Sequence, residues 1–208
     1  MALRKSWQWI GAFGPDLMLC SASAQVGLLK RSWWAVWDGS RLHEGRRAPF
    51  ALAMEPAGRS VEASSNVAWT RKTPLRIRGT VLGREIDLPG LLDESKGRHP
   101  RRTSWLWSAG AGTTPDGRPV FWNLVEGMFE GECAVWVDGE PQLVGRLPFA
   151  GLDGVGDLRF EAVARRAKRE NYLVLKSDYE QPFGHFTGSL PTGVVTGHGV
   201  MERHEALW

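Results

Sequence analysis

Three side chains near the end of the chain could ligate a metal or move protons: His198, Glu202 and His204. They are separated by even numbers of residues, so all three share one face if this segment is a strand. At about 3.3 Å per residue, Glu202 and His204 lie about 7 Å apart along such a strand, and His198 lies about 13 Å further away. A zinc site needs three or four converging ligands. The spacing therefore favours hydrogen-bonded residues, and we expect no metal.

General acid–base chemistry would draw on a different set. Its candidates are Glu126, Glu202, His185 and His204, because burial can shift the pKa of a carboxyl or imidazole group toward neutrality. The sequence does not rank these four. It contains no P-loop, no Gly-x-Gly-x-x-Gly after a strand, no Gly-x-Ser-x-Gly elbow, no His-Glu-x-x-His and no Cys-x-x-Cys. We expect no cofactor, and whether the protein is an enzyme stays open.

The stretch from Asp93 to Gly127 would position such residues, because its pattern is typical of a β-hairpin. Trp105 and Trp107 alternate with smaller residues on the first arm, and the second arm alternates around Trp122. The turn between the arms is Thr114-Pro115-Asp116-Gly117. We expect Trp105 and Trp107 to share one buried face, with Trp122 on the neighbouring arm.

The same hairpin supplies the predicted ligand-binding residues, which are Trp105, Trp107, Trp122 and Asn123. An amide in such an apolar run must be paired when it is buried, and structural pairing of Asn123 is favoured over ligand recognition.

Short alternating runs fill the rest of the chain and predict an all-β fold, an antiparallel sandwich or barrel. An opening hairpin is expected from Trp7 to Val26. A short helix over 164–170 is the alternative to a strand there. The charged segment from Asp93 to Arg102 predicts a boundary between two β-halves, residues 1–92 and 93–208, which could also form one compact unit.

Composition excludes some partners. The chain has 26 Lys and Arg against 23 Asp and Glu, with the basic residues dispersed, so nucleic acid is not an expected partner.

No stretch approaches the roughly 20 apolar residues that span a bilayer. Asp16 interrupts the N-terminal apolar run, which argues against a signal peptide, and a cytoplasmic location is expected. Cys20 and Cys133 are expected to be buried and reduced. The oligomeric state is not indicated.

Several motifs together resemble DUF2804, a family of unknown function. They are Trp7-x-Trp9-Ile10-Gly11, Phe13-Gly14-Pro15-Asp16-Leu17-Met18, Trp69-Thr70-Arg71-Lys72, Arg102-Thr103-Ser104-Trp105-x-Trp107-Ser108-Ala109-Gly110, Trp122-Asn123-Leu124-Val125, Trp136-Val137-Asp138-Gly139-Glu140 and Gly197-x-Gly199-Val200-Met201-Glu202-Arg203-His204. The last motif is more remotely similar to the Gly-x-Gly-Tyr-x-Glu segment of carotenoid hydratase and AttH-like proteins, with Val200 in place of the tyrosine. The resemblance implies two lipocalin-like β-barrel halves in tandem. It leaves open whether a further N-terminal strand is missing here.

Three functions follow as hypotheses. The leading one is a lipocalin-like protein that binds a small hydrophobic molecule in a barrel cavity. The second is a hydratase or isomerase in which Glu202, Glu126 or a nearby His protonates an alkene of a lipid or isoprenoid. The third is a carbohydrate-binding module, which would need exposed tryptophans such as Trp33 or Trp34; because these two are adjacent, they are expected on opposite faces.

Overall fold

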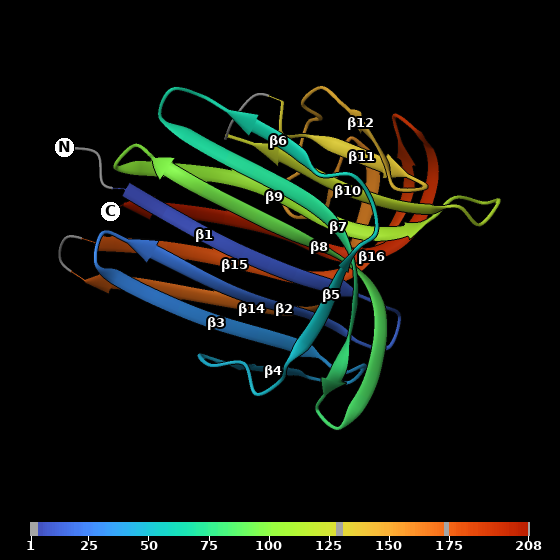
Figure 1. Ribbon diagram of the computed structural model, residues 1–208, viewed down its shortest axis with the longest axis horizontal. Coiled ribbons are helices and arrows are strands. Elements are labelled where there is room, and N and C mark those ends of the chain that lie inside the picture. Colours follow the sequence, from blue (N-terminus) through green and yellow to red (C-terminus); the bar gives the residue numbers. More distant parts are fainter. Residues whose placement is uncertain (1–3, 128–130, 173–174, 208) are drawn as a thin grey trace.

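The structure, a computed structural model, describes residues 4–127, 131–172 and 175–207. All regular elements in these ranges are β-strands, arranged in two antiparallel sheets (Figure 1). The first sheet has the order β4-β3-β2-β1-β8-β7-β5, with β6 also paired to β7. Its strands are β1 (Arg4–Phe13), β2 (Met18–Val26), β3 (Leu29–Trp37), β4 (Leu42–Gly45), β5 (Leu52–Pro56), β6 (Val61–Ser64), β7 (Ala68–Val81) and β8 (Arg84–Arg98).

The second sheet has the order β12-β11-β10-β9-β16-β15-β14-β13. Its strands are β9 (Arg102–Thr113), β10 (Pro119–Glu126), β11 (Ala134–Val137), β12 (Glu140–Leu143), β13 (Gly154–Val155), β14 (Asp157–Tyr172), β15 (Leu175–Leu190) and β16 (Gly193–Leu207). The predicted all-β antiparallel fold is confirmed. The chain passes from the first sheet to the second between Arg98 and Arg102. The division into domains 1–92 and 93–208 stays a prediction.

The predicted Trp hairpin is formed by β9 and β10. Its turn is closed by a hydrogen bond from the Gly117 N–H to the Thr114 carbonyl, and Gly117 has a φ of 85°, a conformation that glycine adopts without strain. Trp107 is paired with Val125, whereas Trp122 is paired with Gly110. Residues 107 and 110 point to opposite faces of a strand. Trp122 therefore lies on the neighbouring arm, as expected, and its side chain is on the opposite face of the hairpin from Trp105 and Trp107.

The alternative of a helix over 164–170 is wrong. These residues belong to β14, which pairs with β15 along nearly its whole length. The Arg-rich run has good helix propensity, but propensity is outweighed by the ladder of backbone hydrogen bonds and by the burial of one face.

The two sheets pack face to face, and a layer of aromatic and polar side chains lies between them. In Figure 1 the blue strands β1, β2 and β3 lie over β14, β15 and β16. Ring contacts cross the layer at Trp9 and Trp107, with centroids 4.7 Å apart, and at Trp7 and Trp105, 6.2 Å apart. We call this region the inter-sheet layer; it contains the residues of the candidate site.

Each sheet also curls over a core on its other face. The curl of the second sheet is filled by Trp122 and Phe186, both fully buried, with ring centroids 5.0 Å apart. The curl of the first sheet packs Trp34, Leu75 and Ile77. Trp33 packs instead against the cluster that contains Trp9 and Trp107. Trp33 and Trp34 therefore lie on opposite faces of β3, as expected.

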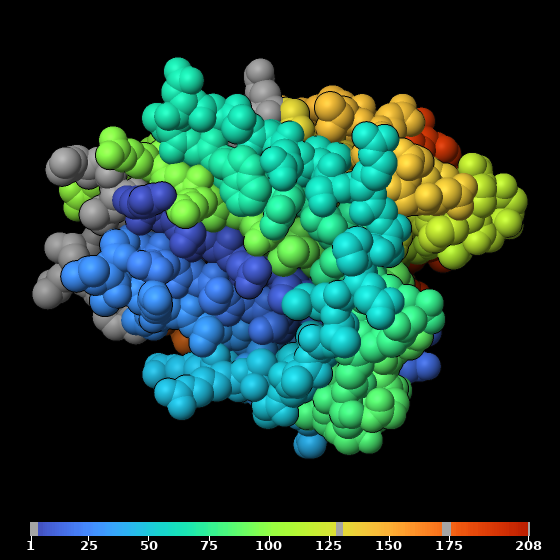
Figure 2. Space-filling view, viewed as in Figure 1, coloured from blue at the N-terminus to red at the C-terminus, as the bar shows by residue number. Residues whose placement is uncertain are grey.

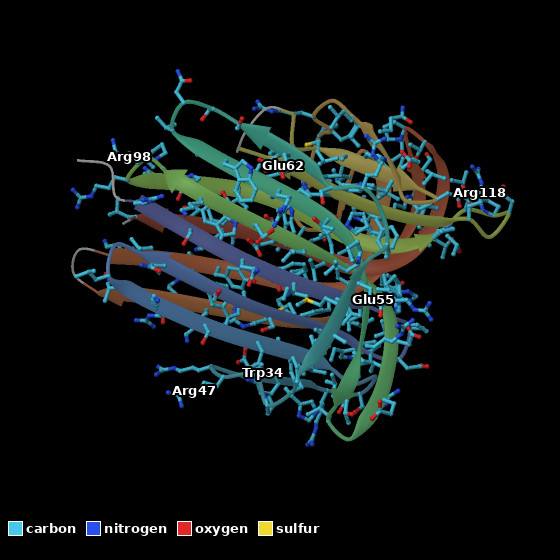
Figure 3. All side chains as sticks on the ribbon, in the orientation of Figure 1. Trp34, Arg47, Glu55, Glu62, Arg98 and Arg118 are labelled. Carbon is cyan, nitrogen blue, oxygen red and sulfur yellow. The ribbon has the colours of Figure 1, made fainter. Side chains whose placement is uncertain are left out.

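The periphery carries charge. The charged side chains labelled in Figure 3, from Arg47 to Arg118, lie at strand ends and turns and are exposed. Cys20 and Cys133 are buried and free, as predicted. The described part of the chain contains no helix that is long and apolar enough to cross a membrane.

Candidate functional site

Glu202 is the acidic side chain at the centre of the inter-sheet layer. It lies on β16 and is 6% exposed. Its Oε1 accepts a hydrogen bond from Trp105 Nε1 at 2.8 Å, and its Oε2 accepts one from Gln181 Nε2 at 2.8 Å. No positively charged side chain forms a salt bridge with Glu202 among the described residues. The carboxyl group is therefore held by neutral donors in a buried setting.

This setting makes Glu202 a group that can exchange a proton near neutral pH. Burial raises the pKa of Glu202 to about 7, because removal from water disfavours the carboxylate. The donors Trp105 and Gln181 and the nearby Tyr179 hydroxyl act in the opposite direction but do not cancel this effect, and the nearby Asp93 adds to it. A carboxyl group with such a pKa can serve as a general acid or base.

Around Glu202 lie buried polar atoms that have no hydrogen-bond partner in the described part of the protein. They are Gln181 Oε1, Trp33 Nε1, Trp9 Nε1 and the Tyr179 hydroxyl. Trp9 Nε1 lies near the Cys20 thiol and the Tyr179 hydroxyl near Glu202, but neither contact has hydrogen-bond geometry. An unsatisfied buried polar group costs about 1–3 kcal/mol. Several in one place call for an explanation such as bound water or a ligand.

Strand alternation brings these groups together. On β15, Tyr179 and Gln181 are two residues apart and face the layer, and Gln181 is paired with Arg166 of β14. On the opposite sheet, Trp9 and Trp33 both align with Ala22 of β2 and so share its face. Trp33 and Tyr179 meet across the layer with ring centroids 6.4 Å apart. With Trp105 and Glu202, the cluster draws on six strands of the two sheets, β1, β3, β9, β14, β15 and β16.

A second buried polar group, further along the layer, is fully paired. Lys72 Nζ lies 2.6 Å from Asp93 Oδ1 and 3.2 Å from Glu132 Oε2. Burial tends to lower the pKa of Lys72, but the two carboxylates outweigh it and the pKa is raised. Lys72 is therefore charged at neutral pH. We assign this triad a structural role, because it joins β7 and β8 to the segment that precedes β11.

The structure separates the four predicted acid–base residues. Of these four, only Glu202 is a buried carboxyl group in the layer. Glu126 is exposed at the end of β10. His185 lies further along the layer, beside His198 and Trp37, with ring centroids 4.9 and 6.5 Å away. His204 Nε2 is bonded to Ser177 Oγ at 2.8 Å, and burial lowers the pKa of His204 to about 4. His204 is thus neutral at pH 7.

The predicted ligand-binding residues are mostly engaged with one another. Trp107 Nε1 donates to Asn123 Oδ1 at 2.8 Å, and Asn123 Nδ2 donates to the Glu132 carbonyl at 2.9 Å. Trp122 Nε1 donates to Ser108 Oγ at 3.1 Å on the far side of the sheet. Trp105 alone of this set contacts Glu202. The structural pairing of Asn123 is the favoured interpretation, and a ligand role for Trp107, Trp122 or Asn123 stays a prediction.

Four residues of the candidate site were not predicted from the sequence: Tyr179, Gln181, Arg166 and Trp9. The available signal was the pair Tyr179 and Gln181, which are two residues apart next to Phe183, the spacing of one face of a strand. Arg166 was hidden in an Arg-rich run that resembles a helix. Which strands of the two sheets oppose each other is not contained in local alternation.

No group of three His, Cys, Asp or Glu side chains is placed to hold a metal ion within the described ranges. Two open depressions lie on other surfaces. One, of about 540 Å³, covers the outer face of the first sheet and is lined by Gln8, Ser23, Trp69 and Glu94. The other, of about 350 Å³, lies beside Arg169 and Lys176. No tryptophan in the described part of the chain is among the exposed large hydrophobic residues that a carbohydrate platform would need.

Comparisons with known proteins add a family and a fold. The sequence model described as "Domain of unknown function (DUF2804)" matches residues 60–208. Among solved structures, a protein provisionally identified as AttH (NE1406) from Nitrosomonas europaea matches with a TM-score of 0.53 at 12% identity, over 96% of this chain and 92% of that chain. Curated protein sequences give no match.

Two further structures are similar at a lower level. CghA with Sch210972 has a TM-score of 0.48 at 9% identity, over 99% of this chain and 88% of that chain. Kievitone hydratase from Nectria haematococca has a TM-score of 0.44 at 10% identity, over 95% and 88%. At 12% identity, the likeness to the protein from Nitrosomonas europaea concerns the fold alone. Together with the two antiparallel sheets, it confirms the predicted lipocalin-like architecture with two β-halves in tandem.

Proposed function

The chain belongs to the DUF2804 family of domains of unknown function. We propose that it binds a small, largely apolar molecule in the inter-sheet layer beside Glu202. The observation that carries the proposal is the set of unpartnered buried polar atoms around this carboxyl, above all Gln181 Oε1 and Trp33 Nε1. They lie among aromatic rings, and ligand sites combine an apolar lining with a few converging polar groups.

The place of the ligand differs from the barrel cavity expected from the sequence. The curl of the second sheet is occupied by Trp122, whose indole N–H donates to Ser108, and by Phe186, whose ring contacts that of Trp122. The layer around Glu202 instead combines aromatic surface with unused donors and acceptors. A molecule with one hydroxyl or carboxamide group suits it, because such a group both donates and accepts hydrogen bonds while the rest of the molecule keeps the aromatic surface covered.

The test is a calorimetric titration of the protein with 2-naphthol and with 2-naphthamide. The wild-type protein should bind at least one of them saturably at one site. Trp33→Phe removes the unpartnered indole N–H and should weaken binding several-fold. Trp69→Phe is the matched control, because Trp69 lies on the outer face and donates to Glu62. Equal effects of the two substitutions, or no saturable binding by the wild type, would overturn the proposal and leave a layer satisfied by water.

A second candidate function is acid–base catalysis, and the pKa of Glu202 favours it. Protonated Glu202 would give its proton to one carbon of an alkene, water would add to the resulting cation, and the proton released by that water would restore the carboxyl group. Incubation with 2-vinylnaphthalene in deuterated water tests this step. Deuterium in the recovered alkene or its alcohol, lost in Glu202→Gln while binding persists, supports catalysis. Binding without any incorporation by the wild type contradicts it.

A further inference from the structure

Arg166 is a buried cation in the same cluster. Its side chain is 8% exposed. Its guanidinium carbon lies 5.0 Å from the ring centroid of Tyr179 and 5.7 Å from that of Trp33. These rings offer favourable cation–π contacts, but they do not neutralise a full charge.

The charge partner of Arg166 is weakly held. Within the described ranges its one ion pair is with Glu44, whose Oε2 lies 3.2 Å from Arg166 Nε without hydrogen-bond geometry. The Glu44 side chain is 55% exposed, and an exposed carboxylate contributes little to an ion pair. A guanidinium has five N–H donors and binds a carboxylate best through two parallel hydrogen bonds. Arg166 uses none of its donors in this way.

Arg166 is also placed at one end of the cluster. It pairs with Gln181 on the neighbouring strand, and Gln181 donates to Glu202 on the next strand. With strands about 4.8 Å apart, the backbones at Arg166 and Glu202 are separated by about 10 Å. β4, which carries Glu44, lies beside β14 at the edge of the layer. Figure 2 shows a gap in the surface between the blue strands and the cyan segment that contains β4, with orange atoms of the second sheet visible in it.

We propose that the ligand is an aromatic or alicyclic carboxylic acid, that Arg166 binds its carboxylate, and that Glu44 takes the place of this carboxylate in the free protein. The inference rests on the proposed function, since it assigns the ligand class of the same site. The apolar body of the ligand would extend from Arg166 along Tyr179 toward Glu202.

The experiment compares 2-naphthoate with its neutral counterpart 2-naphthamide by calorimetry at about pH 6, where naphthoate is ionised and Glu202 is mostly protonated. The wild type should bind naphthoate about tenfold tighter or more, because a hydrogen bond to a charged group is stronger than one between neutral groups. Arg166→Gln should abolish this preference. Arg169→Gln is the matched control on the same strand, since Arg169 is an exposed partner of Asp178.

Glu44→Gln provides a test at an exposed position where folding is not at risk. Removing the competing carboxylate should tighten naphthoate binding and leave naphthamide unchanged. Equal affinity of the wild type for the two compounds, a preference that survives Arg166→Gln, or weaker naphthoate binding by Glu44→Gln would each overturn the inference while binding itself persists. If the wild type binds neither compound nor 2-naphthol, the proposed function fails with it.

Discussion

Glu202 is the residue at which charge, burial and stability are most tightly linked. Its pKa is about 7 in the folded protein against an ordinary value of 4.5, so between these pH values the folded state binds more protons than the unfolded state. Stability therefore falls as pH rises through this window, and the whole loss is present above pH 7. At 1.36 kcal/mol per pKa unit, the loss is about 3 kcal/mol. Glu202→Gln should raise the melting temperature at pH 8 and change it little at pH 4.

The difference in melting temperature between wild type and Glu202→Gln isolates this effect. The depressed pKa values of His99 and His204 add their own pH dependence, but they do so in both proteins. The difference should grow steadily from pH 5 to pH 8. A constant difference would show that Glu202 titrates normally.

At this scale the sequence predicted part of the site. Even spacing on a strand placed Glu202 on one face with His198 and His204, because alternation is a local property. It could not separate Glu202 from Glu126, since burial depends on which sheet covers each strand. Tyr179, Gln181 and Arg166 become site residues only through the approach of the first sheet, which no local pattern contains.

The hairpin β9–β10 is the element that links the site to the core. Trp107 is 5% exposed, meets Trp9 edge to face and donates to Asn123. Trp107→Ala should cost about 3–5 kcal/mol, because it opens a cavity and leaves Asn123 without a donor. Trp69→Ala on the outer face should cost much less. Thermal or urea unfolding measures both, and a melting temperature for Trp107→Ala within a degree or two of wild type would contradict this role.

A substitution at Gly110 tests whether the Trp122 ring packs against β9 on the face opposite Trp107. A Cβ atom built on Gly110 would lie 2.1 Å from Cζ2 of Trp122 and 2.6 Å from the His198 carbonyl. Gly110→Ala should therefore destabilise the protein by about 1–3 kcal/mol through overpacking. Gly145→Ala is the control, because a Cβ there meets no atom within 4 Å. Equal stability of the two variants in urea would mean that Trp122 does not pack against β9 here.

Hairpins could be predicted from the sequence, but the register between their arms could not. Alternation and turn residues identified the hairpin from Trp7 to Val26 and a hairpin within the stretch from Asp93 to Gly127, because they depend on neighbours in sequence. The start of the second hairpin was not predicted, since residues 93–98 belong to β8. The face of Trp122 relative to Trp107 depends on register, which is set by pairing across the turn, and a shift of one residue exchanges the two faces.

At the scale of the whole molecule, the buried triad of Lys72, Asp93 and Glu132 links the first sheet to the second. Lys72→Ala would leave Asp93 and Glu132 as unpaired buried carboxylates, and breaking a buried pair in this way costs about 3–5 kcal/mol. Arg76→Ala is the matched control, since it removes only an exposed pair with Asp87. Urea unfolding at pH 7 should show a large loss for Lys72→Ala and little change for Arg76→Ala. Similar urea midpoints for the two variants would contradict a stabilising role of the Lys72 triad.

The tandem architecture could be predicted from the resemblance and the number of strands. The packing of the sheets could not, because it is decided by long-range contacts such as Trp9 with Trp107 and Arg166 with Glu44. These contacts also bring together the residues of the candidate site, so no local pattern in the sequence could place them in one layer.

A crystal structure of the protein grown with saturating 2-naphthoate tests most directly whether a ligand binds in the inter-sheet layer. We expect the naphthalene ring between the two sheets beside Tyr179, with its carboxylate on Arg166 and Glu44 displaced. We also expect Gln181 and Glu202 to line the far end of the ring. Naphthoate bound only in the outer depression beside Trp69, or an inter-sheet layer filled solely by side chains and water at saturation, would show that the layer is not the binding site.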